Sequence, residues 1–151
     1  MESLLERGVD INSRDTSDQT PIVRVARKGI VDVVHLLVER GAEVDSRDMW
    51  GWTPLHIASR NGPFEASRVL VDHGANVNAR THGQWTPLHL SASYGFLEIV
   101  KLLLERGADT HAVNGDGQTR YEESLGSRFL RIADLLQDHG AGRVRLDDEI
   151  L

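Results

Sequence analysis

The sequence predicts an all-α repeat solenoid, built from short helical units that stack along the chain. A Thr-Pro pair returns every 33 residues, at Thr20-Pro21, Thr53-Pro54 and Thr86-Pro87. Glycine keeps the same interval, at Gly8, Gly41, Gly74, Gly107 and Gly140. A fixed period of this length is typical of stacked repeat proteins, in which each unit buries its apolar face against its neighbours.

The first helix of each unit is best illustrated by the residues that follow Thr53. Threonine before proline favours a helix start, because the hydroxyl can cap the helix and proline suits its first turn. Leu55 and Ala58 are three residues apart and fall on one helix face. Gly62 can end this helix in a left-handed conformation. The pattern therefore predicts a short first helix between Thr53 and Gly62.

A second helix is expected to follow, over residues 64–73 in the same unit, and to stop at Gly74. Its apolar stripe has helical spacing and is too small to hold an isolated helix pair, so stacking must bury it. The expected stripes are Val33, Leu36 and Leu37; Ala66, Val69 and Leu70; Ile99, Leu102 and Leu103; and Ile132, Leu135 and Leu136.

These motifs resemble the ankyrin repeat. Thr53-Pro54-Leu55-His56 and Thr86-Pro87-Leu88-His89 match its Thr-Pro-Leu-His signature, and residues 74–79 and 107–109 match its Gly-Ala-Asp-Val-Asn loop. The resemblance implies helix–turn–helix units joined by β-hairpin-like loops that project as fingers. It implies structural roles for His56 and His89, which hydrogen-bond backbone and neighbouring repeats. It also implies that a partner binds the fingers and the concave face formed by the first helices.

The period divides the chain into six expected segments. They are a partial N-terminal repeat (1–19), ankyrin repeats at 20–52, 53–85 and 86–118, a C-terminal capping repeat (119–142) and an acidic tail (143–151). The cap is expected because Thr119-Arg120-Tyr121-Glu122 is more polar than the motif it replaces, as the end of a stack requires.

The N-terminal segment lacks the first helix of its unit, although the following residues Ile22, Val23 and Val25 are apolar. Two interpretations follow. Either the chain is a piece of a longer array, or a second molecule covers this face and the chain self-associates.

Composition narrows the classes of function. The net charge of −6 argues against nucleic-acid binding, and the lack of cysteine excludes disulfides and thiolate zinc sites. No apolar run approaches the roughly 20 residues needed to span a bilayer, so no membrane attachment is expected. We expect an intracellular protein, cytoplasmic or nuclear. Motifs of catalysis, metal ligation or phosphate binding are not found in the sequence, which predicts no enzyme and no cofactor.

Equivalent positions in the repeats distinguish residues that the fold requires from residues that can serve a partner. The position before each threonine holds Gln19, Trp52, Trp85 and Gln118, so the fold does not demand tryptophan there. We expect Trp52 and Trp85 side by side, roughly 10 Å apart if they follow helix-packing spacing.

Trp, Tyr and Arg are enriched in interface hot spots. The candidate partner-binding residues are Met49, Trp50, Trp52, Arg60, Asn61, Trp85, Ser93 and Tyr94.

The alternative for Trp52 and Trp85 is that they pack on loop backbones and stiffen the fingers. A methyl-lysine reader is a further alternative, because Trp52 resembles one wall of the aromatic cage in the ankyrin domains of some histone methyltransferases. However, Ile57 and Leu90 take the places of the other walls, and Arg60 replaces the acid.

The finger loops contain two further candidate features. Arg14, Arg47 and Arg80 recur in register, with Asp15 and Asp48 beside the first two. We expect local pairing across fingers; the alternative is a basic ladder that binds an acidic peptide, which makes Arg47 and Arg80 candidate binding residues.

Asn12 resembles the sites that an asparaginyl hydroxylase modifies in ankyrin loops, and Asp45, Asn78 and His111 take the equivalent places. The alternative is a polar side chain that bonds the backbone of its own loop.

Taken together, these residues predict a protein–protein interaction module that binds a protein or peptide through the finger loops and the concave face of the middle repeats. The alternative is a regulatory or inhibitory ankyrin arm of a larger multidomain effector.

Overall fold

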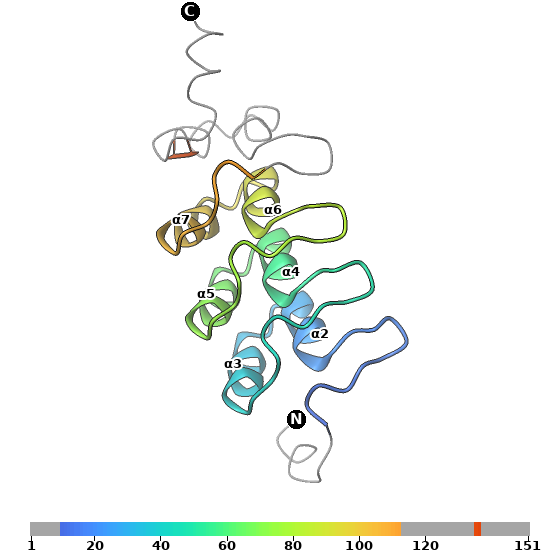
Figure 1. The fold of residues 1–151 in the computed structure, drawn as a ribbon. Coiled ribbons are helices and arrows are strands. Elements are labelled where there is room, and N and C mark those ends of the chain that lie inside the picture. The colour runs from blue at the N-terminus through green and yellow to red at the C-terminus, as the bar shows by residue number, and fades with distance from the viewer. Residues whose placement is uncertain (1–9, 113–134, 137–151) are drawn as a thin grey trace, which may run out of the picture. The chain divides into compact units, whose positions relative to one another are not determined.

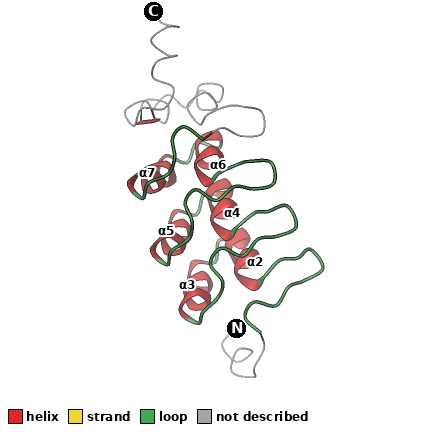
Figure 2. Ribbon diagram, in the orientation of Figure 1, coloured by secondary structure: helices red, strands yellow, loops and turns green. Residues whose placement is uncertain are grey.

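The computed structural model describes residues 10–112 and 135–136, which fall into two compact units at residues 1–76 and 77–151 (Figure 1). Helices and connecting loops make up the described part, and no strand occurs in it (Figure 2). The expectations for Gly8, Gln118, Ile132, the acidic tail and most of the capping repeat lie outside the described residues.

The first unit contains two helix pairs. They are α2 (Pro21–Lys28) with α3 (Val31–Glu39) and α4 (Pro54–Asn61) with α5 (Phe64–Asp72). Helix α2 packs on α4 and α3 packs on α5, while each first helix also contacts its own second helix. Figure 1 shows α2 beside α4 in one layer and α3 beside α5 in the other. The pairs therefore stack as the sequence predicts.

The second unit contains α6 (Pro87–Ser93) and α7 (Leu97–Glu105), which pack against each other. Leu88 of α6 and Ile99 and Leu103 of α7 are almost completely buried. The apolar stripe expected for this second helix is therefore confirmed.

Two of the first helices begin with a capping box. The hydroxyl of Thr53 accepts a hydrogen bond from the N–H of His56 at 3.3 Å, and the Nδ1 atom of His56 accepts one from the N–H of Thr53 at 3.1 Å. Thr86 and His89 form the same pair. This arrangement satisfies donors that the first turn of a helix leaves unpaired.

Helix α2 also begins after its Thr-Pro pair, but without a capping box. Thr20 makes no side-chain cap; its hydroxyl bonds the hydroxyl of Ser46 at 2.7 Å. Val23 occupies the place of the histidine and offers no polar atom to complete a capping box.

The apolar stripes of the second helices are mostly as expected. Those of α5 and α7 are buried. In α3, by contrast, Val34 and Leu37 are fully buried, whereas Val33 and Leu36 are only half-buried. Val33 and Leu37 both line a cavity of about 470 Å³. The stripe expected for α3 is therefore only partly buried.

Each finger folds back through a tight turn. The N–H of the residue at its start donates to the carbonyl at its end, at 3.0 Å from Asp48 to Trp52 and 2.9 Å from Thr81 to Trp85. One residue in each turn has a positive φ, 81° at Gly51 and 68° at Gln84. These hydrogen bonds give the fingers the hairpin-like form that was expected.

Candidate partner-binding site

A cavity of about 480 Å³ lies in the first unit, where the finger before α4 meets the C-terminal ends of α2 and α4. We call it the Trp50 pocket. Its lining residues are Arg27, Asp48, Trp50, Trp52, Ile57, Arg60 and Asn61. The sequence identified Trp50, Trp52, Arg60 and Asn61 as candidates, and the structure brings these four together.

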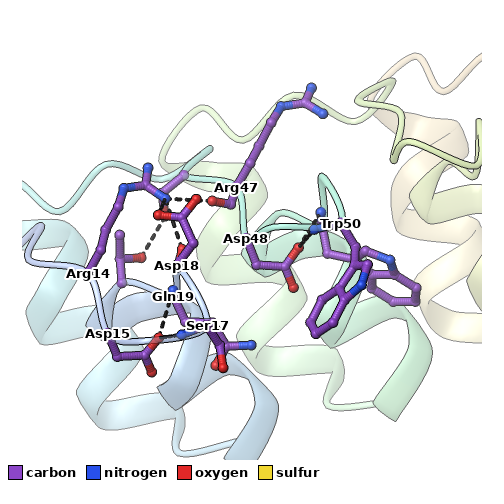
Figure 3. A network of polar contacts seen from close by, with 11 residues as sticks. Arg14, Asp15, Ser17, Asp18, Gln19, Arg47, Asp48 and Trp50 are labelled. Carbon is purple, nitrogen blue, oxygen red and sulfur yellow. Dashed lines mark hydrogen bonds and ion pairs between the residues drawn. The ribbon is translucent and has the colours of Figure 1, made fainter.

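The finger at the pocket is held rigid by Asp48. Its Oδ1 atom accepts hydrogen bonds from the backbone N–H groups of Trp50 and Trp52, both at 2.9 Å. Figure 3 shows this carboxylate turned toward the Trp50 backbone. Asp15 does the same in the preceding finger, where it accepts from the N–H of Gln19 at 2.9 Å. The aspartate therefore fixes the backbone that carries both tryptophans.

Trp50 and Met49 form the exposed tip of this finger. Their relative exposures are 54% and 52%, which are the largest among the exposed large apolar residues in the described part of the chain. Exposed apolar side chains that gather on a soluble protein mark an interaction surface. Neither side chain belongs to the buried core, so its size serves no evident packing need.

Trp52 has a different environment, because it is half-buried against the cluster of Val23, Ala26 and Ile57. Its ring centroid lies 6.0 Å from that of His56. The guanidinium carbon of Arg60 lies 5.5 Å from the Trp52 ring centroid, within cation–π range. Trp52 thus forms the apolar floor of the pocket. Since Arg60 already stacks on this ring, the structure offers no support for a methyl-lysine cage there.

A family comparison agrees with this architecture. A model described as ankyrin repeats, in three copies, matches residues 1–81 and 26–114. The chain belongs to the ankyrin repeat family. Ankyrin repeats in general are protein–protein interaction modules. No curated protein matches the chain.

The second unit of this ankyrin chain holds four other candidates, of which Arg80 is described with the finger arginines below. Trp85 is half-buried and its ring lies 5.8 Å from that of His89, which repeats the relation of Trp52 to His56. Tyr94 follows α6 and is 51% exposed, whereas Ser93 is half-buried. Each tryptophan therefore packs on the histidine of its own helix. The expectation that Trp52 and Trp85 lie side by side stays a prediction.

The finger arginines bond oxygen atoms of the finger loops, and Arg14 also pairs with the carboxylate of Asp18 at 3.4 Å. An Arg14 nitrogen donates to the carbonyls of Asp18 at 2.9 Å and Arg47 at 2.6 Å (Figure 3). Arg47 donates to the carbonyl of Gly51 at 3.2 Å, and Arg80 to the Oε1 atom of Gln84 at 3.3 Å. Arg14 thus makes the expected contact between fingers, with a carbonyl as the acceptor.

The carboxylates beside these arginines act on their own fingers. The hydrogen bond from the Gln19 N–H lowers the pKa of Asp15 below its usual value, and the charges of Arg24 and Arg27 lower it further. The finger aspartates are therefore loop-stabilising groups, as the comparison of Asp15 with Asp48 shows.

Asn12 and its equivalents connect successive ankyrin repeats. The Oδ1 atom of Asn12 accepts from the N–H of Glu43 at 2.8 Å, and that of Asn78 accepts from the N–H of Asp109 at 2.7 Å. The Asn12 oxygen thus bonds the backbone of the next repeat, a contact that the sequence did not predict. Hydroxylation of Asn12 stays a prediction.

The first unit also contains the cavity of about 470 Å³, which has apolar walls at Val25, Ile30, Val33 and Leu37. Self-association through the N-terminal end of the repeats stays a prediction.

Two classes of feature are not found within the described residues. No helix there is both long and apolar enough to cross a bilayer. No group of three or more His, Asp or Glu is placed there to hold a metal ion.

Sequence reasoning missed three residues of the Trp50 pocket. Arg27 is the equivalent of Arg60 one period earlier, so the internal alignment contained the signal. The sequence presents Ile57 only as a departure from an aromatic cage, and Asp48 only as a neighbour of Arg47. Their roles as floor and finger support depend on how the finger folds onto α4.

Proposed function

We propose that this ankyrin chain is a protein-interaction module that binds a peptide segment of a partner protein at the Trp50 pocket. The observation that carries the proposal is the exposed Trp50 side chain, which lies beside an apolar floor and whose backbone N–H donates to Asp48. A site whose backbone is already ordered loses less conformational entropy on binding, which favours affinity.

The dimensions and chemistry of the pocket support this proposal. A cavity of about 480 Å³ accommodates one or two side chains of a bound segment. Trp52 and Ile57 provide the apolar contact, while Arg60 and Asn61 provide donors at its edge. Met49 extends the apolar surface at the finger tip.

The other candidates are proposed as additional contact residues. In the second unit, these are Trp85, Ser93, Tyr94 and Arg80; in the first, Arg47. We rank Trp50 above Trp52 and Trp85, because the latter two also pack on His56 and His89.

Selection of displayed random peptides on the immobilised chain, followed by fluorescence anisotropy of the selected peptides, tests the proposal. Trp50→Ala should weaken binding by more than about tenfold, as expected for an interface hot spot. Ile30→Ala is the matched control, because Ile30 is 44% exposed in the same unit and does not line the Trp50 pocket. Equal binding by wild type and Trp50→Ala would contradict the proposal.

A further inference from the structure

The surface around the Trp50 pocket carries a charge opposite to that of the whole chain. The chain has a net charge of −6, yet helix α2 contains Arg24, Arg27 and Lys28 and no acidic residue. Helix α4 contains Arg60 and also has no acidic residue. The acidic residues of this unit's helices belong to α3 and α5, at Asp32, Glu39, Glu65 and Asp72. The first-helix layer is therefore the basic side of the unit.

Arg27, Lys28 and Arg60 line two adjoining cavities. A cavity of about 370 Å³, lined by Arg27, Lys28, Gly29, Asn61, Gly62 and Pro63, shares Arg27 and Asn61 with the Trp50 pocket. The Nδ2 atom of Asn61 donates to the carbonyl of Arg27 at 3.2 Å, which ties together the ends of α2 and α4. Arg27, Lys28 and Arg60 are all exposed along this surface.

The acidic groups near this surface do not cancel its charge. Asp48 lines the pocket, but it is only 5% exposed and its Oδ1 atom accepts two backbone hydrogen bonds. Asp15 lies 3.9 Å from Arg24, which we therefore leave out of the binding set. Among the residues that line the two cavities, Arg27, Lys28 and Arg60 are cations and Asp48 is the one carboxylate. Asp15 lines neither cavity, although the charge of Arg27 acts on it.

The repeat itself shows that the fold does not require these cations. One period after Arg60 the chain has Ser93, and one period after Asn61 it has Tyr94. Helix α6 thus ends with the uncharged residues Ser93 and Tyr94, the second of which is its C-cap. A basic helix end in the first unit is therefore available for recognition.

From this arrangement, and resting on the proposed function, we infer that the bound segment is acidic. It is an extended peptide of a partner protein that places an aromatic or aliphatic side chain against Trp50 and Trp52. Its Asp or Glu side chains lie beside Arg27, Lys28 and Arg60, whose donors match carboxylates. Apolar burial anchors this peptide, and the charges select it over neutral and basic segments.

The probe is a library of random peptides displayed on phage, selected on the full chain. The selected peptides should combine Asp or Glu with an aromatic or aliphatic residue, and their synthetic copies should bind more weakly as ionic strength rises. The double variant Arg27→Glu, Lys28→Glu should weaken binding by about tenfold or more. Lys101→Glu, on α7 and outside both cavities, is the charge control and should change affinity by less than about twofold.

The outcomes separate this inference from the proposed function. Neutral or basic peptides that depend on Trp50 but not on Arg27 and Lys28 would overturn the inference and leave the proposed function standing. Failure to select any peptide whose binding depends on Trp50 would overturn both. A labelled single-stranded oligonucleotide is tested in parallel; if it bound more tightly than the acidic peptides through the same residues, the ligand would be a nucleic acid and the inference would be wrong.

Circular dichroism of each variant must match that of the wild type, since the test concerns the charges and not the fold. Arg27→Gln with Lys28→Gln gives a second, milder measurement that removes the charges without reversing them. We expect this variant to bind about threefold or more weakly, and unchanged binding would count against the inference.

Discussion

Substitution by alanine should affect different properties at the two tryptophans of the first unit. Trp50→Ala removes an indole that is 54% exposed at a finger tip, whereas Trp52→Ala removes one that packs on Val23, Ala26 and Ile57. The first change should therefore affect binding, and the second should affect mainly stability.

The expected magnitudes follow from burial. Truncation of a fully buried tryptophan to alanine costs about 3–5 kcal/mol in the free energy of unfolding. Because Trp52 is half-buried, we expect about half of that, or about 2 kcal/mol, including the loss of its stacking with Arg60. For a protein of this size this corresponds to a fall in Tm of about 4–8 °C. An exposed residue such as Trp50 should change stability by less than about 0.5 kcal/mol.

Urea unfolding followed by far-UV circular dichroism measures both variants, since this signal does not depend on the deleted indole. Equal losses of stability in the two variants would refute the reasoning, as would a loss below about 0.5 kcal/mol for Trp52→Ala. A small loss for Trp52→Ala would mean that its contact with the first-helix cluster contributes no net stability, whereas equal losses would mean that the exposed Trp50 stabilises the fold as much as Trp52 does.

Three further predictions concern the helix caps and fingers. His56→Ala should lower the free energy of unfolding, measured by urea unfolding, by about 2–4 kcal/mol, because it leaves the buried N–H and hydroxyl of Thr53 without their Nδ1 partner. A loss below about 1 kcal/mol would contradict a structural role for the capping box. Asp15 has a lowered pKa in the fold, so its charge stabilises the protein fully above its ordinary pKa of 3.8 and this stabilisation is lost as the pH falls below that value. Asp15→Asn should therefore be less stable than the wild type near neutral pH, and the difference between the two urea midpoints should shrink as the pH falls below 3.8; a constant difference would argue against the titration of Asp15. Gln84→Gly should raise the free energy of unfolding by about 0.5 kcal/mol, because Gln84 has a positive φ of 68° that glycine adopts without strain; a destabilised variant would show that the bond from Arg80 outweighs the strain.

The internal alignment predicted more of this protein than any single motif. The 33-residue period placed the helix starts at Thr53 and Thr86, and it assigned His56 and His89 to structure. The capping boxes confirm that assignment. It also indicated which residues near the fingers vary between repeats, and four of these line the Trp50 pocket.

Other features could not be derived from the alignment because they depend on contacts between segments. Trp52 and Trp85 share a position with Gln19, which suggested that the fold does not need an aromatic side chain there. In the structure each tryptophan packs on a capping-box histidine, and Gln19 precedes the helix that has Val23 instead. The change from glutamine to tryptophan at this position therefore accompanies a change from valine to histidine in the helix that follows, and it need not reflect partner binding alone.

The sequence by itself determined the repeat, the order of the helices and the residue types available for binding. These depend on local chemistry, because a Thr-Pro start, a glycine stop and an apolar stripe act within one short segment. Only the tertiary structure decided which side chains form a site. The Asp48 hydrogen bonds turn the finger, Asn61 joins the ends of α2 and α4, and Arg60 reaches the Trp52 ring. The physical reason is that the pocket walls come from segments about one period apart, so their meeting depends on how the helix pairs stack.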